Sequence, residues 1–97
     1  MFDIKFTDSA KEDIRYFTKA EQTRILLEIE TQLRYEPTVA TRNRKQLRKT
    51  DIATYELRIG SVRVFYNVFD LENVVDVVAI GRKEHNELFV GGKKVTL

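Results

Sequence analysis

Two arginines near the middle of the chain are spaced so that their charges would meet. Tyr55–Ile59 and Val62–Tyr66 each alternate apolar and polar residues, and Gly60-Ser61 between them suits a two-residue hairpin turn. Antiparallel pairing about this turn sets Arg58 beside Arg63, on the face opposite the apolar residues. Like charges at such a position repel unless an anion lies between them. The spacing therefore predicts an anion-binding site.

More basic residues flank this predicted hairpin. Residues 37–49 carry five basic and no acidic side chains, a local charge of +5. The formal net charge of the whole chain is only +2, so all of the positive excess lies in this segment. A further group, Arg82, Lys83 and His85, follows the β-branched run Val74–Ile80. The cations of the loop are Arg42, Arg44, Lys45, Arg48 and Lys49. Together they predict a surface that attracts an anionic partner.

These residue types are sufficient, in principle, to cleave RNA through its own 2′-hydroxyl. The reaction needs a proton acceptor, a proton donor and cations that stabilise the charge developing on the phosphate. Arginine and lysine supply the cations, and histidine, present here as His85, is the side-chain type best suited to exchanging a proton at cellular pH. The same residues have simpler interpretations. The loop is equally consistent with a solvated surface or with a site for an acidic protein. His85 is also consistent with a residue that has no catalytic role. Arg58 could instead form an ion pair with Glu56 or Asp51.

Several other classes of function lack their residues. The chain has one histidine and no cysteine, so a zinc site is not expected, and no glycine-rich phosphate loop is present. A Ser-His-Asp triad has no nucleophile-elbow context. No run of about 18 apolar residues and no signal peptide occur, so we expect a soluble protein of the reducing cytoplasm without metal or nucleotide cofactor.

The remaining pattern predicts one α+β domain over residues 1–97. Residues 3–7 alternate as a strand, and Ser9 and Thr18 each begin the spacing of a helix capping box, predicting helices over 9–19 and 18–35. Ile25, Leu26, Ile29 and Leu33 form the apolar stripe of the second helix. Strands at 55–59, 62–69 and 74–80 form an antiparallel three-stranded meander with the helices on one face. The conformation of residues 81–97 is left open.

The chain resembles the RelE/ParE superfamily of toxins from bacterial type II toxin–antitoxin systems, and the resemblance spans nearly its whole length. It rests on a set of four segments, Lys45–Arg48, Tyr55–Ile59, Val62–Tyr66 and Val77–Phe89. The resemblance implies the RelE-like fold and a cognate antitoxin that wraps the toxin in a hetero-oligomer. For RelE-like members it implies metal-independent cleavage of messenger RNA in the ribosomal A site, which inhibits translation.

The resemblance also implies roles for single residues. Arg63 matches the arginine thought to stabilise the transition state, Lys83 falls where a second catalytic arginine is usual, and Arg58 matches a basic residue before the hairpin. Phe89 replaces the tyrosine of many active relatives, so it can stack on a base but cannot move a proton, and Glu56 replaces a lysine. His85 is then the candidate acid or base.

We therefore expect Arg58, Arg63, Lys83 and His85 to be catalytic. The expected RNA-binding residues are Arg42, Arg44, Lys45, Arg48, Lys49, Arg82 and Phe89. Two alternatives remain: a ParE-like protein that inhibits DNA gyrase by binding it, and an inactive relative that binds only RNA or antitoxin.

Overall fold

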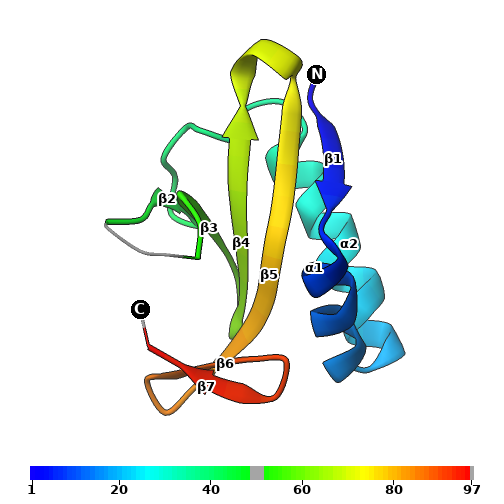
Figure 1. Cartoon of the computed structure of the whole chain (residues 1–97), viewed down its shortest axis with the longest axis vertical. Coiled ribbons are helices and arrows are strands. Elements are labelled where there is room, and N and C mark those ends of the chain that lie inside the picture. The colour runs from blue at the N-terminus through cyan, green and yellow to red at the C-terminus, as the bar shows by residue number, and fades with distance from the viewer. Residues whose placement is uncertain (49–51, 97) are drawn as a thin grey trace.

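The computed structural model describes residues 1–48 and 52–96. In it, two helices pack on one face of a mixed sheet, and the N-terminal strand lies at one side of that sheet (Figure 1). The elements are β1 Asp3–Phe6, α1 Asp8–Asp13, the 3₁₀ turn η1 Ile14–Tyr16, α2 Lys19–Leu33, β2 Arg44–Gln46, β3 Tyr55–Ile59, β4 Val62–Phe69, the 3₁₀ turn η2 Asp70–Glu72, β5 Val74–Glu84, β6 Glu87–Val90 and β7 Lys93–Val95.

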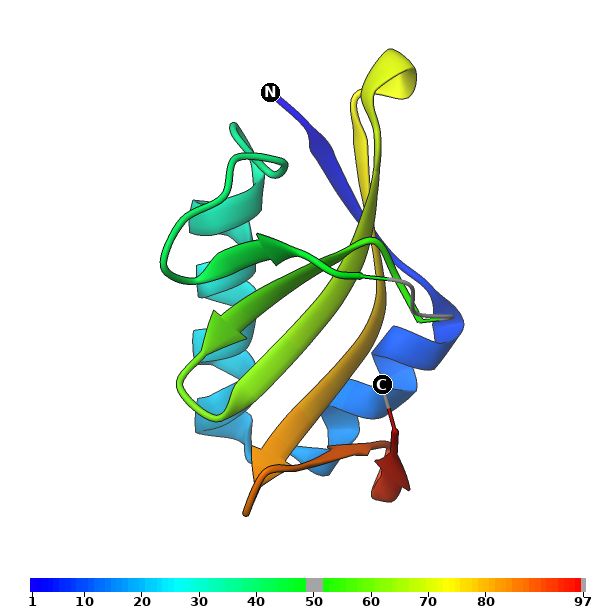
Figure 2. The ribbon, with the colours of Figure 1, turned by 90° about the vertical axis from the view of Figure 1, so that its left-hand side faces the viewer.

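The sheet is larger than the predicted meander. Its described strands follow the order β2-β3-β4-β5-β6-β7, all antiparallel, and β1 pairs with β5 in parallel. The predicted N-terminal strand, helix pair and β3–β5 meander are confirmed, and the additional strands are β2, β6 and β7. β5 runs on to Glu84 because its first half pairs with β1 and its last residues pair with β6. The C-terminal hairpin thereby crosses the foot of the sheet (Figures 1 and 2).

The helix boundaries follow their caps. The predicted capping box at Thr18 is confirmed, since its hydroxyl accepts from Glu21 N–H and the Glu21 carboxylate accepts from Thr18 N–H. The predicted cap at Ser9 is wrong, because Thr7 accepts the Ala10 N–H at 3.2 Å instead. The first helical segment ends at Tyr16, where extended backbone at Phe17 turns its buried ring inward.

The main core lies between the helices and the sheet. Ile25, Ile29 and Leu33 of α2 are at most 1% exposed and pack in the same cluster as Val64 and Tyr66. The predicted stripe was wrong at one position, since Leu26 is 43% exposed. A residue beside Ile25 lies about 100° away around the helix and misses the sheet.

Tyr66 joins the sheet to the loop after α2. Its ring is fully buried and stacks on Tyr55 at a centroid distance of 5.4 Å, and its hydroxyl donates to Pro37 O at 2.6 Å. Burial raises the pKa of the Tyr66 hydroxyl far above its ordinary value. The phenol is therefore a neutral donor that holds the loop against the core.

A gap between β1 and β6 exposes part of one edge of β5. β1 pairing ends at Val77 and β6 pairing begins at Gly81. Asp13 fills the gap by accepting the Ile80 N–H at 3.1 Å. Burial raises the pKa of the Asp13 carboxyl, and this effect outweighs the lowering by the Ile80 N–H. Asp13 thus completes the hydrogen bonding of the sheet at a cost in desolvation.

The face of the sheet away from the helices carries a smaller apolar cluster. Phe65, Ala79, Leu88 and Ala53 are buried there. Strand alternation sends Phe65 to this cluster and Tyr66 to the main core, and both are fully buried, while the register shift beside them leaves Val78 of β5 unpaired. None of the described helices is long and apolar enough to cross a membrane.

Candidate nucleic-acid interface

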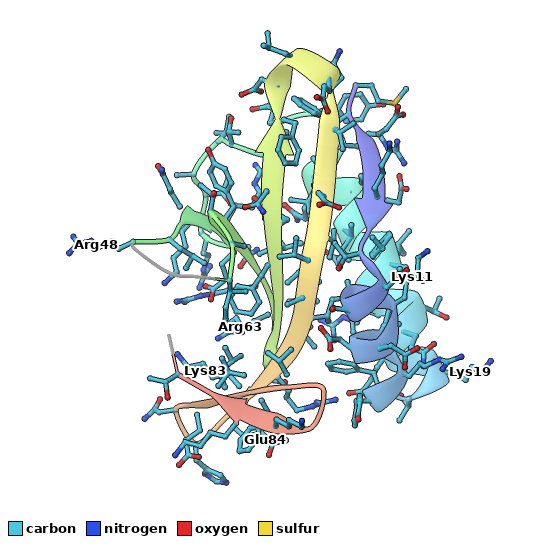
Figure 3. The ribbon with its side chains drawn as sticks, in the orientation of Figure 1. Lys11, Lys19, Arg48, Arg63, Lys83 and Glu84 are labelled. Carbon is cyan, nitrogen blue, oxygen red and sulfur yellow. The ribbon has the colours of Figure 1, made fainter. Side chains whose placement is uncertain are left out.

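A cleft of about 360 Å³ opens on the face of the sheet away from the helices. It receives side chains from β3, β4, β5, β6 and β7, so it exists only because the C-terminal hairpin folds beneath the meander. Figure 3 labels Arg63 and Lys83, which approach it from β4 and β5. Its lining residues are Glu56, Arg63, Lys83, Asn86, Glu87, Leu88, Lys94, Val95 and Thr96. We call it the basic cleft, after Arg63, Lys83 and Lys94.

Arg58 and Arg63 are directly opposed in the β3–β4 register, as predicted. The chain itself supplies a negative charge between such cations. Glu56 is only 4% exposed, and its Oε2 lies 3.3 Å from Arg58 Nε and 3.7 Å from Lys45 Nζ. Of the two carboxylates considered for Arg58, Glu56 is a partner and Asp51 lies outside the described residues.

Arg63 is held by the backbone of its own hairpin. Its Nη1 donates to Gly60 O at 2.7 Å and to Val62 O at 3.0 Å. Burial lowers the pKa of the Arg63 guanidinium, Arg58 lowers it further, and Glu56 opposes both. Arginine still remains charged at any pH a cell reaches. The arrangement therefore presents a desolvated, oriented cation to the cleft.

Arg63 and Lys83 are not neutralised by a neighbouring carboxylate. Within residues 1–48 and 52–96 neither forms an ion pair, whereas Arg58 and Lys45 pair with Glu56. Lys83 is exposed, and its backbone N–H donates to Ser61 O at 2.8 Å, which fixes β5 beside the β3–β4 turn. These two cations remain available to an anion.

Lys94 is a cation of the cleft that the sequence analysis missed. Its Nζ lies 3.4 Å from Glu87 Oε2 across the β6–β7 pair. The signal was the Gly91-Gly92 dipeptide, whose φ angles of +59° and +76° form the hairpin turn. A glycine pair between two short apolar runs predicts such a hairpin, and in that hairpin Lys94 pairs with Phe89.

Arg82 and Phe89 lie on the helix side of the sheet, away from the basic cleft. Arg82 Nη2 donates to Glu21 Oε2 at 2.6 Å, and its Cζ lies 4.8 Å from the centroid of the Phe17 ring. Phe89 is the β6 partner of Arg82 and lines a separate hollow of about 200 Å³ with Tyr16 and Phe17. Arg82 thus joins β5 to the start of α2.

His85 lies in the tight turn between β5 and β6. Its φ is +51° and that of Asn86 is +66°, the left-handed pair typical of a two-residue hairpin turn. The His85 side chain is exposed and does not line the basic cleft, although Asn86 beside it does. His85 is therefore at the rim.

The loop cations have different surroundings. Arg44 Nη1 donates to Gln32 O in the last turn of α2 at 2.5 Å and to Glu36 O in the loop that follows at 2.7 Å. Lys45 contacts Glu56, as described above. Arg42 and Arg48 are exposed, and Figure 3 shows Arg48 extending from the end of β2. Lys49 lies outside the described residues.

The chemistry available to this site is that of cations and carboxylates. Among the described residues no group of three or more His, Asp or Glu side chains is arranged to hold a metal ion. Arg63, Lys83 and Lys94 can bind a phosphate, and Glu56 in the same cleft can accept a proton.

The comparisons with known proteins agree with this fold. The chain matches the family model described as ParE toxin of type II toxin–antitoxin system, parDE, over residues 4–87. No curated protein matches it. It is similar to a chain of the toxin–antitoxin complex RelBE2 from Mycobacterium tuberculosis, with a TM-score of 0.69 and 23% identity over 84% of this chain and 98% of that one. It is also similar to a chain of the archaeal RelE–RelB complex from Pyrococcus horikoshii, with a TM-score of 0.66 and 23% identity over 81% of this chain and 91% of that one.

The family model covers most of the chain, including both helices, the meander and the turn that carries His85. The chain therefore belongs to the RelE/ParE superfamily and is a toxin of a type II toxin–antitoxin system.

Proposed function

We propose that this toxin is a metal-independent endoribonuclease that cuts messenger RNA in the ribosomal A site and so inhibits translation. The observation that carries the proposal is the composition of the basic cleft. Arg63 and Lys83, without ion pairs in the described part of the chain, share it with the buried carboxylate of Glu56. A proton acceptor and oriented cations in one cleft are the main requirements for transesterification at a phosphodiester.

The reaction begins at a ribose 2′-hydroxyl. Glu56 accepts its proton, the 2′-oxygen forms a bond to phosphorus, and the bond from phosphorus to the 5′-oxygen breaks. His85 donates a proton to that leaving oxygen from the rim. The products are a 2′,3′-cyclic phosphate and a 5′-hydroxyl end. Arg63 and Lys83 stabilise the negative charge of the phosphorane, and Arg58 positions the Glu56 carboxylate.

The surface around the cleft suits an RNA strand. Arg42, Lys45 and Arg48 are exposed on the loop and on β2, and Lys45 pairs with Glu56, so it lies on the same face of the sheet as Arg58. Such cations bind the phosphate backbone without regard to sequence, and the affinity they provide falls with salt. Arg44, Lys49, Arg82 and Phe89 remain in the proposed RNA-binding set, with Arg44 and Arg82 acting through the elements they hold.

A cognate antitoxin is the second partner we propose. Both similar structures are complexes of a toxin with its antitoxin. Because the basic cleft is open, an antitoxin must bind the toxin to keep it inactive in the cell that produces it. We therefore expect this chain to be purified from its own operon as a hetero-oligomer.

The test is incubation of the pure toxin with ribosomes programmed with a defined messenger, followed by mapping of the new 5′ ends. We expect cuts within codons that occupy the A site, carrying 5′-hydroxyl ends. Arg63→Ala should lower the cutting rate by about 10²–10³-fold, the usual cost of removing one donor to a developing oxyanion. Arg15→Ala removes an exposed arginine of η1 and should cut at the wild-type rate. Absence of cuts in the wild-type reaction would contradict the proposal.

The second candidate function is inhibition of DNA gyrase by direct binding. The match to the family model described as ParE toxin favours it, as does Glu56, which neutralises cations that a nuclease would use. A supercoiling assay with pure gyrase distinguishes the two functions. Loss of supercoiling while programmed messenger stays intact would support this candidate over the nuclease.

A further inference from the structure

A second, smaller hollow lies at the end of the β3–β4 hairpin, between its turn and the N-terminal half of α2. Figure 2 shows this turn beside the lower part of the helix. The volume of the hollow is about 90 Å³, a quarter of the 360 Å³ of the basic cleft, so it suits one small polar group better than a base. We call it the turn hollow, and its lining residues are Glu21, Arg24, Ile25, Ile59, Gly60, Ser61, Val62 and Arg82.

Arg24 supplies an uncompensated positive charge to the turn hollow. It follows Glu21 by three residues and so lies on the same flank of α2, and the Glu21 carboxylate reaches Arg82 of β5 at 2.6 Å. The Arg24 side chain is exposed and has no ion pair or hydrogen bond within residues 1–48 and 52–96. Because Glu21 is already neutralised by Arg82, the hollow keeps one positive charge in excess, that of Arg24.

The hairpin turn adds hydrogen-bond donors to the same hollow. Its two carbonyls are occupied, since Gly60 O accepts from Arg63 Nη1 and Ser61 O accepts from the Lys83 N–H. The N–H groups of both turn residues and the Ser61 hydroxyl form no hydrogen bond in the part of the chain that the structure describes. A Cβ placed on Gly60 would meet no atom within 4 Å, so the approach to the turn is open. Successive backbone N–H groups in a turn are suited to binding an anion.

We propose that the turn hollow binds a second phosphate of the RNA strand whose scissile phosphate occupies the basic cleft. The inference rests on the proposed nuclease function. The two sites are continuous, because Arg63 and Lys83 of the cleft are the residues bonded to the carbonyls of the turn. Ser61 and Arg63 are two residues apart, about 7 Å along an extended strand. Arg24 binds the second phosphate by its charge and the turn binds it by hydrogen bonds, which position the strand without reading its sequence.

The experiment measures the affinity of the pure toxin for 2′-O-methyl oligoribonucleotides of increasing length, which cannot be cut because they lack the attacking hydroxyl. Fluorescence anisotropy at several salt concentrations gives Kd and its salt dependence. The affinity of the wild type should rise once the oligonucleotide reaches both the cleft and the turn hollow. Arg24→Gln should remove this rise and weaken binding of the longer oligonucleotides by about three- to tenfold. It should also reduce the slope of log affinity against log salt by about 0.7, the value for one phosphate contact to a single strand.

Two variants separate the turn hollow from other effects. Lys19→Gln makes the same charge change in the same helix, but Lys19 does not line the hollow, and Figure 3 shows it extending away from the sheet. This control should match the wild type in affinity and slope. Ser61→Ala should weaken binding of the longer oligonucleotides by about two- to fivefold without changing the slope, because it removes a hydrogen-bond donor and no charge.

The length dependence decides the outcome. An identical length dependence in the wild type and Arg24→Gln would overturn the inference, as would equal losses in Arg24→Gln and Lys19→Gln or no length effect in the wild type. Cutting of programmed messenger by the wild type is measured separately. Absence of cutting with the length effect intact would contradict the nuclease function and leave the phosphate site.

Discussion

Arg82 and Lys83 are neighbours in β5, yet they lie on opposite faces of the sheet and have different surroundings. Arg82 lies on the helix-covered face, where Glu21 and the Phe17 ring enclose its guanidinium. Lys83 lies on the open face, exposed and without an ion pair in the described part of the chain. On one face a cation joins elements together, and on the other it is left for a ligand.

The two faces also differ in how completely their polar groups are satisfied. On the helix-covered side, Asp13, Tyr66 and Arg44 each bind a backbone group that would otherwise lack a partner. On the open side, Arg63 is held by carbonyls, but its charge is not balanced by a carboxylate at ion-pair distance among the described residues. A partly buried cation whose charge no neighbouring carboxylate balances is a candidate functional group.

The largest difference between the faces should appear when these neighbours are replaced. Lys83→Ala should slow messenger cutting by about 10²-fold, since it removes a cation aimed at the developing charge, and should leave the thermal unfolding midpoint unchanged. Arg82→Ala should keep the cutting rate within a few-fold but lower that midpoint, because β5 loses its link to α2. Cutting assays and thermal unfolding on both variants check the pair. Equal loss of cutting in the two would remove the distinction between the faces.

Truncating a side chain in the core between the helices and the sheet tests whether this face contributes stability and not catalysis. The quantity compared is the free energy of unfolding. Leu33→Ala should reduce the free energy of unfolding by about 2–5 kcal/mol, because the side chain is fully buried against the sheet. Leu27→Ala, at a position 64% exposed in the same helix, is the matched control and should change it by less than about 0.5 kcal/mol. Chemical denaturation measures both values. The folded fraction of Leu33→Ala should cut messenger at the wild-type rate.

Asp13 offers a smaller and pH-dependent effect. Asp13→Ala should cost about 1–3 kcal/mol because Ile80 N–H loses its acceptor. Burial raises the pKa of the folded-state carboxyl above its ordinary value near 3.8, so folding favours the protonated form. Its contribution to stability is full below that ordinary value and declines as pH rises through the raised one.

Asp13→Asn keeps an acceptor for Ile80 N–H without a charge to desolvate. It should therefore be at least as stable as the wild type at pH 7, with the difference shrinking as pH approaches 4. Unfolding free energies measured across this range provide the check. A wild type that gains stability between pH 4 and 7 relative to Asp13→Asn would show that the carboxylate is stabilised, not penalised, in the folded protein.

Much of the fold could be predicted from local patterns. The β3–β4 hairpin with its opposed arginines, the Thr18 capping box and the apolar stripe of α2 each depend on residues close in sequence. The errors were also local. Thr7 and not Ser9 caps α1, since several hydroxyls near a helix start can serve and the tertiary position of β1 selects among them. Leu26 was assigned to the core because the helix periodicity alone does not tell how wide the covered stripe is.

The site was less predictable than the fold. Arg63 and Lys83 were identified as candidate residues, but Lys94 lines the same cleft only because the Gly91-Gly92 turn pairs β7 with β6. Arg82 was grouped with Lys83 from sequence proximity, although strand alternation sends the two to opposite faces.

The amino-acid sequence by itself thus determined the element types, the hairpin register and the identity of the cations, because these depend on periodicity, turn residues and charge over a few positions. Which cations stay free was decided by the tertiary structure. In the folded structure, Glu56 contacts Arg58 and Lys45, and Glu21 contacts Arg82. Arg44 binds the carbonyl of Gln32 in α2. The Glu56–Arg58 pair follows from alternation within β3, whereas the other partnerships join different segments of the chain, and no local pattern encodes their distance in space.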